Sequence, residues 1–100
     1  MTRRVVPLLP TPSQELAIPL GGQACQLRVY AKAFGVYVDV FVNDALVIGG
    51  VVSRNLTRVV RSRYLGFVGD LYFVDTAGED DPTVAGLGSR FVLVYDDDLQ

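Results

Sequence analysis

Apolar and polar residues alternate through the middle of the chain with a period of two, which is the period of a β-strand. The clearest case is the stretch 36–52, VYVDVFVNDALVIGGVV, in which valines occupy every second position from Val36 to Val42. Asn43 and Asp44 interrupt this pattern before the apolar run resumes. Both residue types tolerate the positive φ angles of tight hairpin turns. The stretch therefore predicts a β-hairpin on which the rest of the domain packs.

Similar patterns predict further strands on both sides of this hairpin, over residues 15–20, 23–32, 64–75 and 90–95. Pro19 places the first of them at a sheet edge, because proline has no N–H to donate to a neighbouring strand. Gly49 and Gly50 predict a bend or a bulge. Residues 53–63 fit a basic loop with a short strand, and 76–88 fit a loop. The fold class is therefore all-β, a single-domain barrel or sandwich of about six antiparallel strands.

The two ends of the chain differ from this pattern. Residues 1–13 contain three prolines, which favour an extended N-terminal arm over a helix or a central strand. The arm also carries Val5, Val6, Leu8 and Leu9, so we expect it to lie on its own domain or on a neighbouring subunit. Residues 14–95 form the β domain, and 96–100 form an acidic tail that we expect to fray. Deletion of residues 1–11 is expected to leave the domain folded.

The composition favours association of the protein with another protein chain. Half of the residues are hydrophobic, slightly more than a small monomer easily buries, and eight of the nine basic residues are arginine. The single cysteine, Cys25, alternates with Leu27 and Val29 and fits a core position. The sequence shows no signal peptide and no stretch long enough for a membrane helix. These features predict synthesis in a reducing cytoplasm and no membrane partner.

The residue types exclude most catalytic chemistry. Histidine is absent and there is one cysteine, so zinc sites and Ser-His or Cys-His nucleophiles are not available. Asp39 and Asp70 lie within predicted strands, where they more often face solvent or pair with arginine than act as acid and base. The acidic runs 79–81 and 96–98 do not have the spacing of an EF-hand. We therefore predict no catalytic residue, no metal site and no cofactor.

Four arginines, Arg54, Arg58, Arg61 and Arg63, lie just before the aromatic residues Tyr64 and Phe67. Basic residues beside aromatics on a small β-barrel are typical of a nucleic-acid-binding module, which is the alternative function. The net charge of −2 argues against specific nucleic-acid binding. The same arginines suit ion pairs with the acidic runs of a neighbouring copy or another protein, which we prefer.

Several short motifs have an order and spacing that are similar to those of one family. They are IPLGGQ (18–23), LRVY (27–30), GVYVDV (35–40), VIGGV (47–51), YLGFVGDL (64–71) and GLGSRF (86–91). This set, across residues 5–95, resembles the plug family of small myophage baseplates, first named for a cyanophage with a minimal contractile tail. The resemblance implies a structural virion protein on the baseplate axis that helps to close the tail channel until contraction, with no catalytic residues.

The resemblance also implies partners. We expect contacts with the hub and the tail-tube initiator, with the tape-measure protein as a further candidate, and a homo-oligomeric ring in which a trimer is favoured. The predicted interface combines the arm, the basic stretch and the acidic tail. Its residues are Arg3, Arg4, Val5, Val6, Leu8, Leu9, Arg54, Arg58, Arg61, Arg63, Asp96, Asp97 and Asp98.

Overall fold

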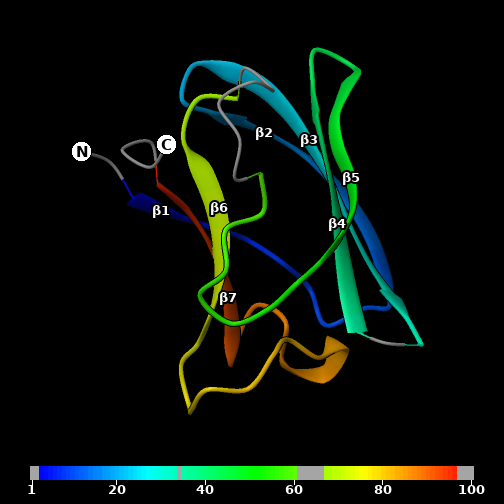
Figure 1. Ribbon diagram of the computed structural model, residues 1–100, viewed down its shortest axis with the longest axis vertical. Coiled ribbons are helices and arrows are strands. Elements are labelled where there is room, and N and C mark those ends of the chain that lie inside the picture. The colour runs from blue at the N-terminus through cyan, green and yellow to red at the C-terminus, as the bar shows by residue number, and fades with distance from the viewer. Residues whose placement is uncertain (1–2, 34, 61–66, 97–100) are drawn as a thin grey trace.

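Two antiparallel sheets pack against each other across one hydrophobic core (Figure 1). The computed structural model describes residues 3–33, 35–60 and 67–96. The four-stranded sheet has the order β2–β3–β4–β5, and the three-stranded sheet has the order β1–β7–β6. The strands are β1 Arg3–Val6, β2 Ser13–Leu20, β3 Gln23–Lys32, β4 Gly35–Val42, β5 Ala45–Val52, β6 Asp70–Asp75 and β7 Phe91–Asp96, with a short 3₁₀ helix, η2 Val84–Gly86.

The central hairpin has the predicted geometry. Strands β4 and β5 pair from Val42 and Ala45 outward, so Asn43 and Asp44 are the two turn residues. Their φ angles are 51° and 66°, and two positive values in succession define the type I′ turn that suits the twist of a hairpin. Val36, Val38 and Val40, on the inner face of β4, are buried, and Val42 beside the turn is partly buried. The period-two prediction is therefore confirmed here.

The predicted bulge is also present, and a carboxylate holds it. The pairing of β4 with β5 shifts register twice between Val38 and Phe41. At the shift, Gly50 has a φ of 68° and its N–H donates to Oδ1 of Asp39 at 2.7 Å. The same oxygen accepts the Tyr30 hydroxyl at 2.8 Å. Asp39 therefore has a structural role in fixing the bulge.

The N-terminal segment is part of the fold. Residues 3–6, which we placed in an arm, form β1 and pair with β7, because the prolines begin only at Pro7 and the preceding N–H groups remain free to bond. Val6 is 1% exposed and Leu8 is 7% exposed, so both belong to the core. Residues 7–12 then cross from the three-stranded sheet to the four-stranded sheet.

The other differences concern the C-terminal half. Asp96, which we placed in a frayed tail, is the last residue of β7 and is buried, because Arg3 lies opposite it in the sheet and forms an ion pair with it at 3.0 Å. The strand predicted over 64–75 begins only at Asp70. The preceding Phe67 lies outside the strand but is buried, and residues 64–66 are outside the described residues. With β1, the described strands number seven, and the predicted small all-β domain is confirmed.

Burial also determines the state of Cys25. Its side chain is 1% exposed in the core, as predicted, and burial raises the pKa of the thiol. A protonated, enclosed thiol is a poor nucleophile. No helix among the described residues is long and apolar enough to cross a membrane.

One ion pair, between the partly exposed Arg90 and the buried Asp75, organises the loop between β6 and β7. Arg90 donates from Nε and Nη2 to the two carboxylate oxygens of Asp75 at 2.8 and 2.9 Å. The N–H groups of Ala77 and Asp80 donate to the same carboxylate at 2.9 and 2.8 Å. These hydrogen bonds, above all those from Arg90, hold the pKa of Asp75 well below its ordinary value of 3.8.

This low pKa predicts acid sensitivity. A carboxyl group whose pKa is lowered by folding stabilises the protein above its unfolded-state pKa, and that contribution is lost as the pH falls through the range below about 4. Thermal unfolding measured from pH 7 to pH 2 should show a falling melting temperature over the acidic part of this range. Asp75→Asn should melt lower at pH 7 and show a flatter acid limb. Parallel curves for the two proteins would contradict the assignment.

Candidate docking surfaces

The outer face of the three-stranded sheet is apolar, which is unusual for a sheet of a small sandwich. The inner positions of β6 and β7 supply the core, so their alternate side chains point outward, away from the four-stranded sheet. The outward side chains at positions 72, 74, 92 and 94 are one tyrosine and three valines, so none of them is charged. We call this surface the outer valine face; its residues are Val5, Leu56, Tyr72, Val74, Val92 and Val94.

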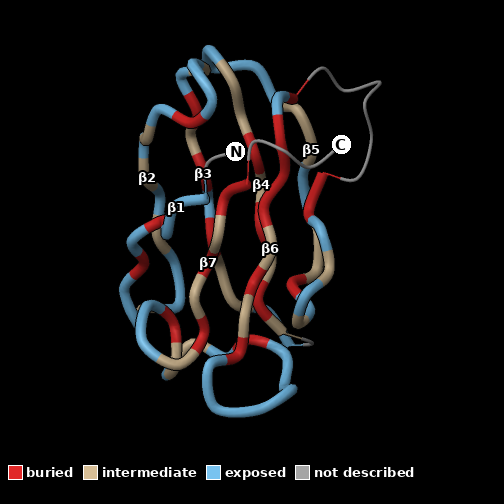
Figure 2. The backbone as a smooth tube through the Cα atoms, turned by 90° about the vertical axis from the view of Figure 1, so that its left-hand side faces the viewer, coloured by how far each residue is buried: buried red, intermediate tan, exposed pale blue. Residues whose placement is uncertain are grey.

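Register places these residues side by side. Val5 lies opposite Val94, which lies opposite Tyr72 on the next strand, so one row crosses all three strands. Val5 is 61% exposed and Leu56, on the loop that follows β5, is 65% exposed. Figure 2 is viewed from this side, with β1, β7 and β6 toward the reader. Contiguous apolar faces are typical of protein–protein interfaces, so the outer valine face is a candidate docking surface.

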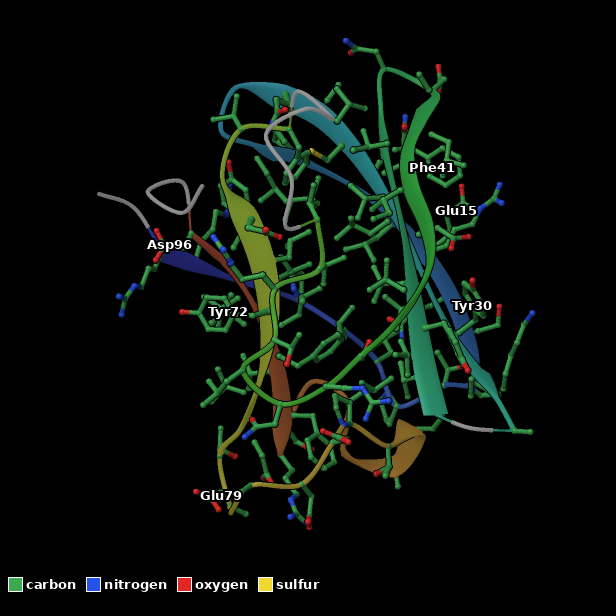
Figure 3. The ribbon with its side chains drawn as sticks, in the orientation of Figure 1. Glu15, Tyr30, Phe41, Tyr72, Glu79 and Asp96 are labelled. Atoms are coloured by element: carbon green, nitrogen blue, oxygen red, sulfur yellow. The ribbon has the colours of Figure 1, made fainter. Side chains whose placement is uncertain are left out.

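A basic hollow adjoins this face. It has a volume of about 380 Å³ and is lined by Arg3, Leu56, Arg58, Tyr72 and Asp96. Figure 3 shows Tyr72 and Asp96 on this outer side of the molecule. The Arg3 side chain is 64% exposed beyond its ion pair with Asp96. The hollow therefore combines an apolar wall with guanidinium groups, a combination that is enriched in interfaces.

The outer face of the four-stranded sheet is mixed, because polar and ion-paired side chains lie among apolar ones such as Phe41 and its cross-strand partner Leu46. Arg28 donates to Glu15 at 3.2 Å and lies 4.9 Å from the centre of the Phe41 ring. The Tyr30 and Tyr37 rings stack at 6.0 Å. Figure 3 shows Glu15, Tyr30 and Phe41 on this side, pointing away from the core.

All four sheet edges carry features that hinder pairing with another strand. The β1 edge has Arg3 and Arg4, β2 contains Pro19, and β5 has the two register shifts. The β6 edge is covered, because N–H groups of the preceding loop bond the carbonyls of Leu71 and Phe73 at 2.9 and 2.8 Å. Docking is therefore expected through a face and not through strand addition.

The comparison with known proteins now decides the family. A family model described as cyanophage baseplate Pam3 plug gp18 matches residues 3–98. The chain belongs to this baseplate plug family. No curated protein matches the chain. The predicted resemblance is confirmed, and the family gives the chain a structural role in the phage tail, in contact with other baseplate proteins.

A structural baseplate family points away from an enzyme, and the carboxylates have structural roles. Asp39 lies in β4 and Asp70 in β6, so they belong to different sheets. Asp70 is fully buried and accepts the N–H of Val60 at 2.8 Å, where it holds the loop that precedes β6. Within the described ranges, no group of three or more Cys, Asp or Glu side chains is arranged to hold a metal ion.

The structure places the predicted interface residues in different surroundings. Arg3, Val5 and Arg58 lie on or beside the outer valine face, and Leu9 is exposed elsewhere. Val6 and Leu8 are core residues, and Asp96 is almost fully buried in its ion pair with Arg3 at the wall of the hollow. Arg4 donates to the carbonyl of Pro19 at 3.1 Å. Arg61, Arg63, Asp97 and Asp98 lie outside the described residues.

Within the described residues, Arg54 and Arg58 of the basic stretch lie in different surroundings and do not form one patch. Arg54 lies 3.7 Å from Asp81 in an exposed ion pair, while Arg58 lines the hollow beside Tyr72. Of the acidic residues 79–81, Asp80 also pairs with Arg90, at 2.8 Å. Some of the charged residues that we predicted to pair between copies therefore form ion pairs within one molecule.

Sequence reasoning did not single out the residues Leu56, Tyr72, Val74, Val92 and Val94 of the outer valine face. For the four that lie in β6 and β7, the signal was present in the runs LYFV and FVLVY, which have no polar alternation. Such runs are typical of strands that are covered on both faces. One face of β6 and β7 covers the core, and the other is the candidate docking surface.

Proposed function

We propose that this protein closes the central channel of a contractile-tail baseplate, near the hub and the end of the tail tube. It does so by protein–protein contacts and not by chemistry, so it is not an enzyme and needs no cofactor. Its neighbours would be the hub and the tail-tube initiator, with the tape-measure protein as a further candidate. Several copies would assemble around the tail axis, with three favoured, after synthesis in the cytoplasm of the bacterial host.

The observation that carries this proposal is the outer valine face of a chain that belongs to the plug family. A permanent structural contact is usually apolar, because burial of apolar surface contributes roughly 25 cal/mol per Å². The outer face of the four-stranded sheet lacks this property. The two sides of the sandwich thus support a protein that is attached by one side and presents the other to water.

A double substitution on the attached side tests the proposal. In phage that depend on a supplied copy of the protein, Val5→Lys with Leu56→Lys should lower incorporation into purified tails by more than about tenfold. An unpaired charge buried in a contact costs several kcal/mol, and about 1.4 kcal/mol is a factor of ten. Incorporation is measured by quantitative mass spectrometry of tails.

The control for this experiment is Leu46→Lys, because Leu46 is 60% exposed but lies on β5 in the other sheet. Surface substitutions of this kind change the free energy of unfolding by about 0.5 kcal/mol or less, so all variants should melt close to the unmodified protein. Normal incorporation of the Val5 and Leu56 variant would refute docking through the outer valine face.

A further inference from the structure

One end of the outer valine face carries an excess of exposed positive charge. At this end β1, β7 and β6 contribute Arg3, Asp96 and Asp70 as one cross-strand row. The two aspartates are 3% and 0% exposed, whereas the Arg3 side chain is 64% exposed. Arg4 and Arg58 are exposed as well. A partner that covers this end therefore meets arginine side chains and no exposed carboxylate from the described part of these three strands.

The loop before β6 places Arg58 at this end. Two N–H groups of the loop donate in turn to the carbonyls of Phe73 and Leu71, at 2.8 and 2.9 Å, so the loop runs along β6 toward the start of that strand. There the buried Asp70 accepts a further N–H of the loop at 2.8 Å. Arg58 is thereby brought to the hollow that Arg3 also lines, although the two residues come from distant parts of the sequence.

This hollow has the chemistry of a carboxylate site. Arg3, Arg58 and Asp96 line it together with the apolar groups of Leu56 and Tyr72, so two guanidinium groups face a single carboxylate (Figure 3). Among the described residues, the Arg3 side chain donates to Asp96 through Nε alone, at 3.0 Å. A guanidinium group binds a carboxylate through paired N–H groups, and apolar walls that exclude water strengthen such bonds. A second carboxylate would balance the charge of the hollow.

The exposed carboxylates of this chain are poorly placed to supply that group from a second copy. With the exception of Glu79, those of the described residues already bond a side chain of their own molecule, so they would have to break that contact first. The pairs are Glu15 with Arg28, Asp44 with Gln26, Asp80 with Arg90 and Asp81 with Arg54. A different protein is therefore the better source of the carboxylate.

We propose that the outer valine face binds an apolar surface of another baseplate protein, and that an Asp or Glu side chain of that surface enters the hollow. The inference rests on the proposed function and adds the chemistry of the partner. Burial of the apolar row of Val5, Val94 and Tyr72 supplies affinity, and the charge pair fixes the register of the two surfaces. Nucleic-acid phosphates would match the arginines but would leave the apolar row uncovered.

Charge reversal in the hollow tests the contact. In phage that depend on a supplied copy of the protein, Arg58→Glu should lower incorporation into purified tails by about 30-fold or more, because loss of one partner of a buried charge pair weakens binding by at least that factor. Arg58→Lys keeps the charge without the paired N–H groups and should lower incorporation by less than about tenfold.

The matched control is Arg54→Glu. Arg54 belongs to the same basic stretch and its side chain is 59% exposed, but it does not line the hollow, so incorporation should be unchanged. Thermal unfolding of each purified variant shows whether it is folded. If Arg58→Glu does not fold, Arg58→Gln removes the charge without reversing it and should still lower incorporation by about tenfold.

Second-site reversion identifies the partner. Phage that carry Arg58→Glu in their own gene should regain plaque formation through changes of Asp or Glu to Lys or Arg in another baseplate protein. Such a charge exchange restores an attractive pair across the interface, which a purely structural role of Arg58 does not predict. Among revertants that retain Arg58→Glu, changes confined to this chain would overturn the proposal.

Two comparisons separate this inference from the proposed function. Val5→Asp places a charge in the apolar row but outside the hollow. If it abolished incorporation while Arg58→Glu entered tails normally, docking through the outer valine face would stand and the acidic partner would be wrong. Normal incorporation of both variants would refute the docking surface itself. If the purified protein retarded duplex DNA at low salt and Arg58→Glu did not, the hollow would be a phosphate site and the carboxylate would be excluded.

Discussion

Removal of residues 1–11 should leave the protein largely unfolded. The deletion takes away β1, which forms one edge of the three-stranded sheet, and takes Val6 and Leu8 out of the core. Full burial of each such side chain contributes about 1.5–3 kcal/mol, so the two together represent roughly 3–6 kcal/mol. The total stability of a domain is only about 5–15 kcal/mol. The sequence alone led us to expect that the domain folds without this segment. The structure leads to the opposite prediction.

Point variants distinguish loss of the core from loss of chain length. Val6→Ala with Leu8→Ala should destabilise strongly, whereas Val5→Ala with Leu9→Ala, at the exposed neighbouring positions, should change the free energy of unfolding by about 0.5 kcal/mol or less. Urea unfolding followed by circular dichroism measures both. A truncated protein that unfolds cooperatively at the same urea concentration as the full chain would show that β1 is dispensable.

Substitution of two adjacent residues of β6 should separate folding from docking. Phe73 is 1% exposed on the inner face, and Phe73→Ala should cost about 3–5 kcal/mol through lost contacts and a cavity. Tyr72 lies on the outer valine face and contacts its cross-strand neighbours, and such pairs contribute about 1 kcal/mol or less. Tyr72→Ala should therefore leave the protein folded.

The same Tyr72→Ala variant should dock poorly. A buried tyrosine at the centre of an interface contributes about 2 kcal/mol or more to binding, which corresponds to a loss of affinity of roughly 30-fold. Chemical unfolding gives the first quantity, and incorporation into tails gives the second. If Tyr72→Ala lowered stability as much as Phe73→Ala and left incorporation unchanged, Tyr72 would be a folding residue and its assignment to the docking surface would be wrong.

The four-stranded sheet could be predicted because each of its pairings joins neighbours in the sequence. Gly21-Gly22 and Asn43-Asp44 mark two of its turns, and the alternation along β3 and β4 shows which side is buried. The three-stranded sheet has no such local signal. The pairing of β1 with β7 places Arg3 opposite Asp96, 93 residues away in the sequence. No local pattern near either residue predicts this contact.

Asp96 illustrates the physical reason for the error. Within DDD, a run of three carboxylates at the end of a strand indicates solvated charge. The residue is buried because a guanidinium arrives from the opposite end of the chain, and a paired carboxylate can enter a site that an unpaired one cannot. In the same way, the prolines of residues 7–12 indicate irregular backbone but do not show that Val6 and Leu8 fill the core.

The pairing of the first strand with the last has a consequence for biosynthesis. Until β7 has left the ribosome, β1 has no partner, and the loop that its pairing closes is almost the whole chain. Closing such a loop is slow and comes late in folding. A product that terminates before residue 91 also leaves β6 without its neighbour. We therefore expect truncated translation products to be degraded and to be missing from assembled tails, so that completion of the polypeptide acts as a checkpoint before assembly.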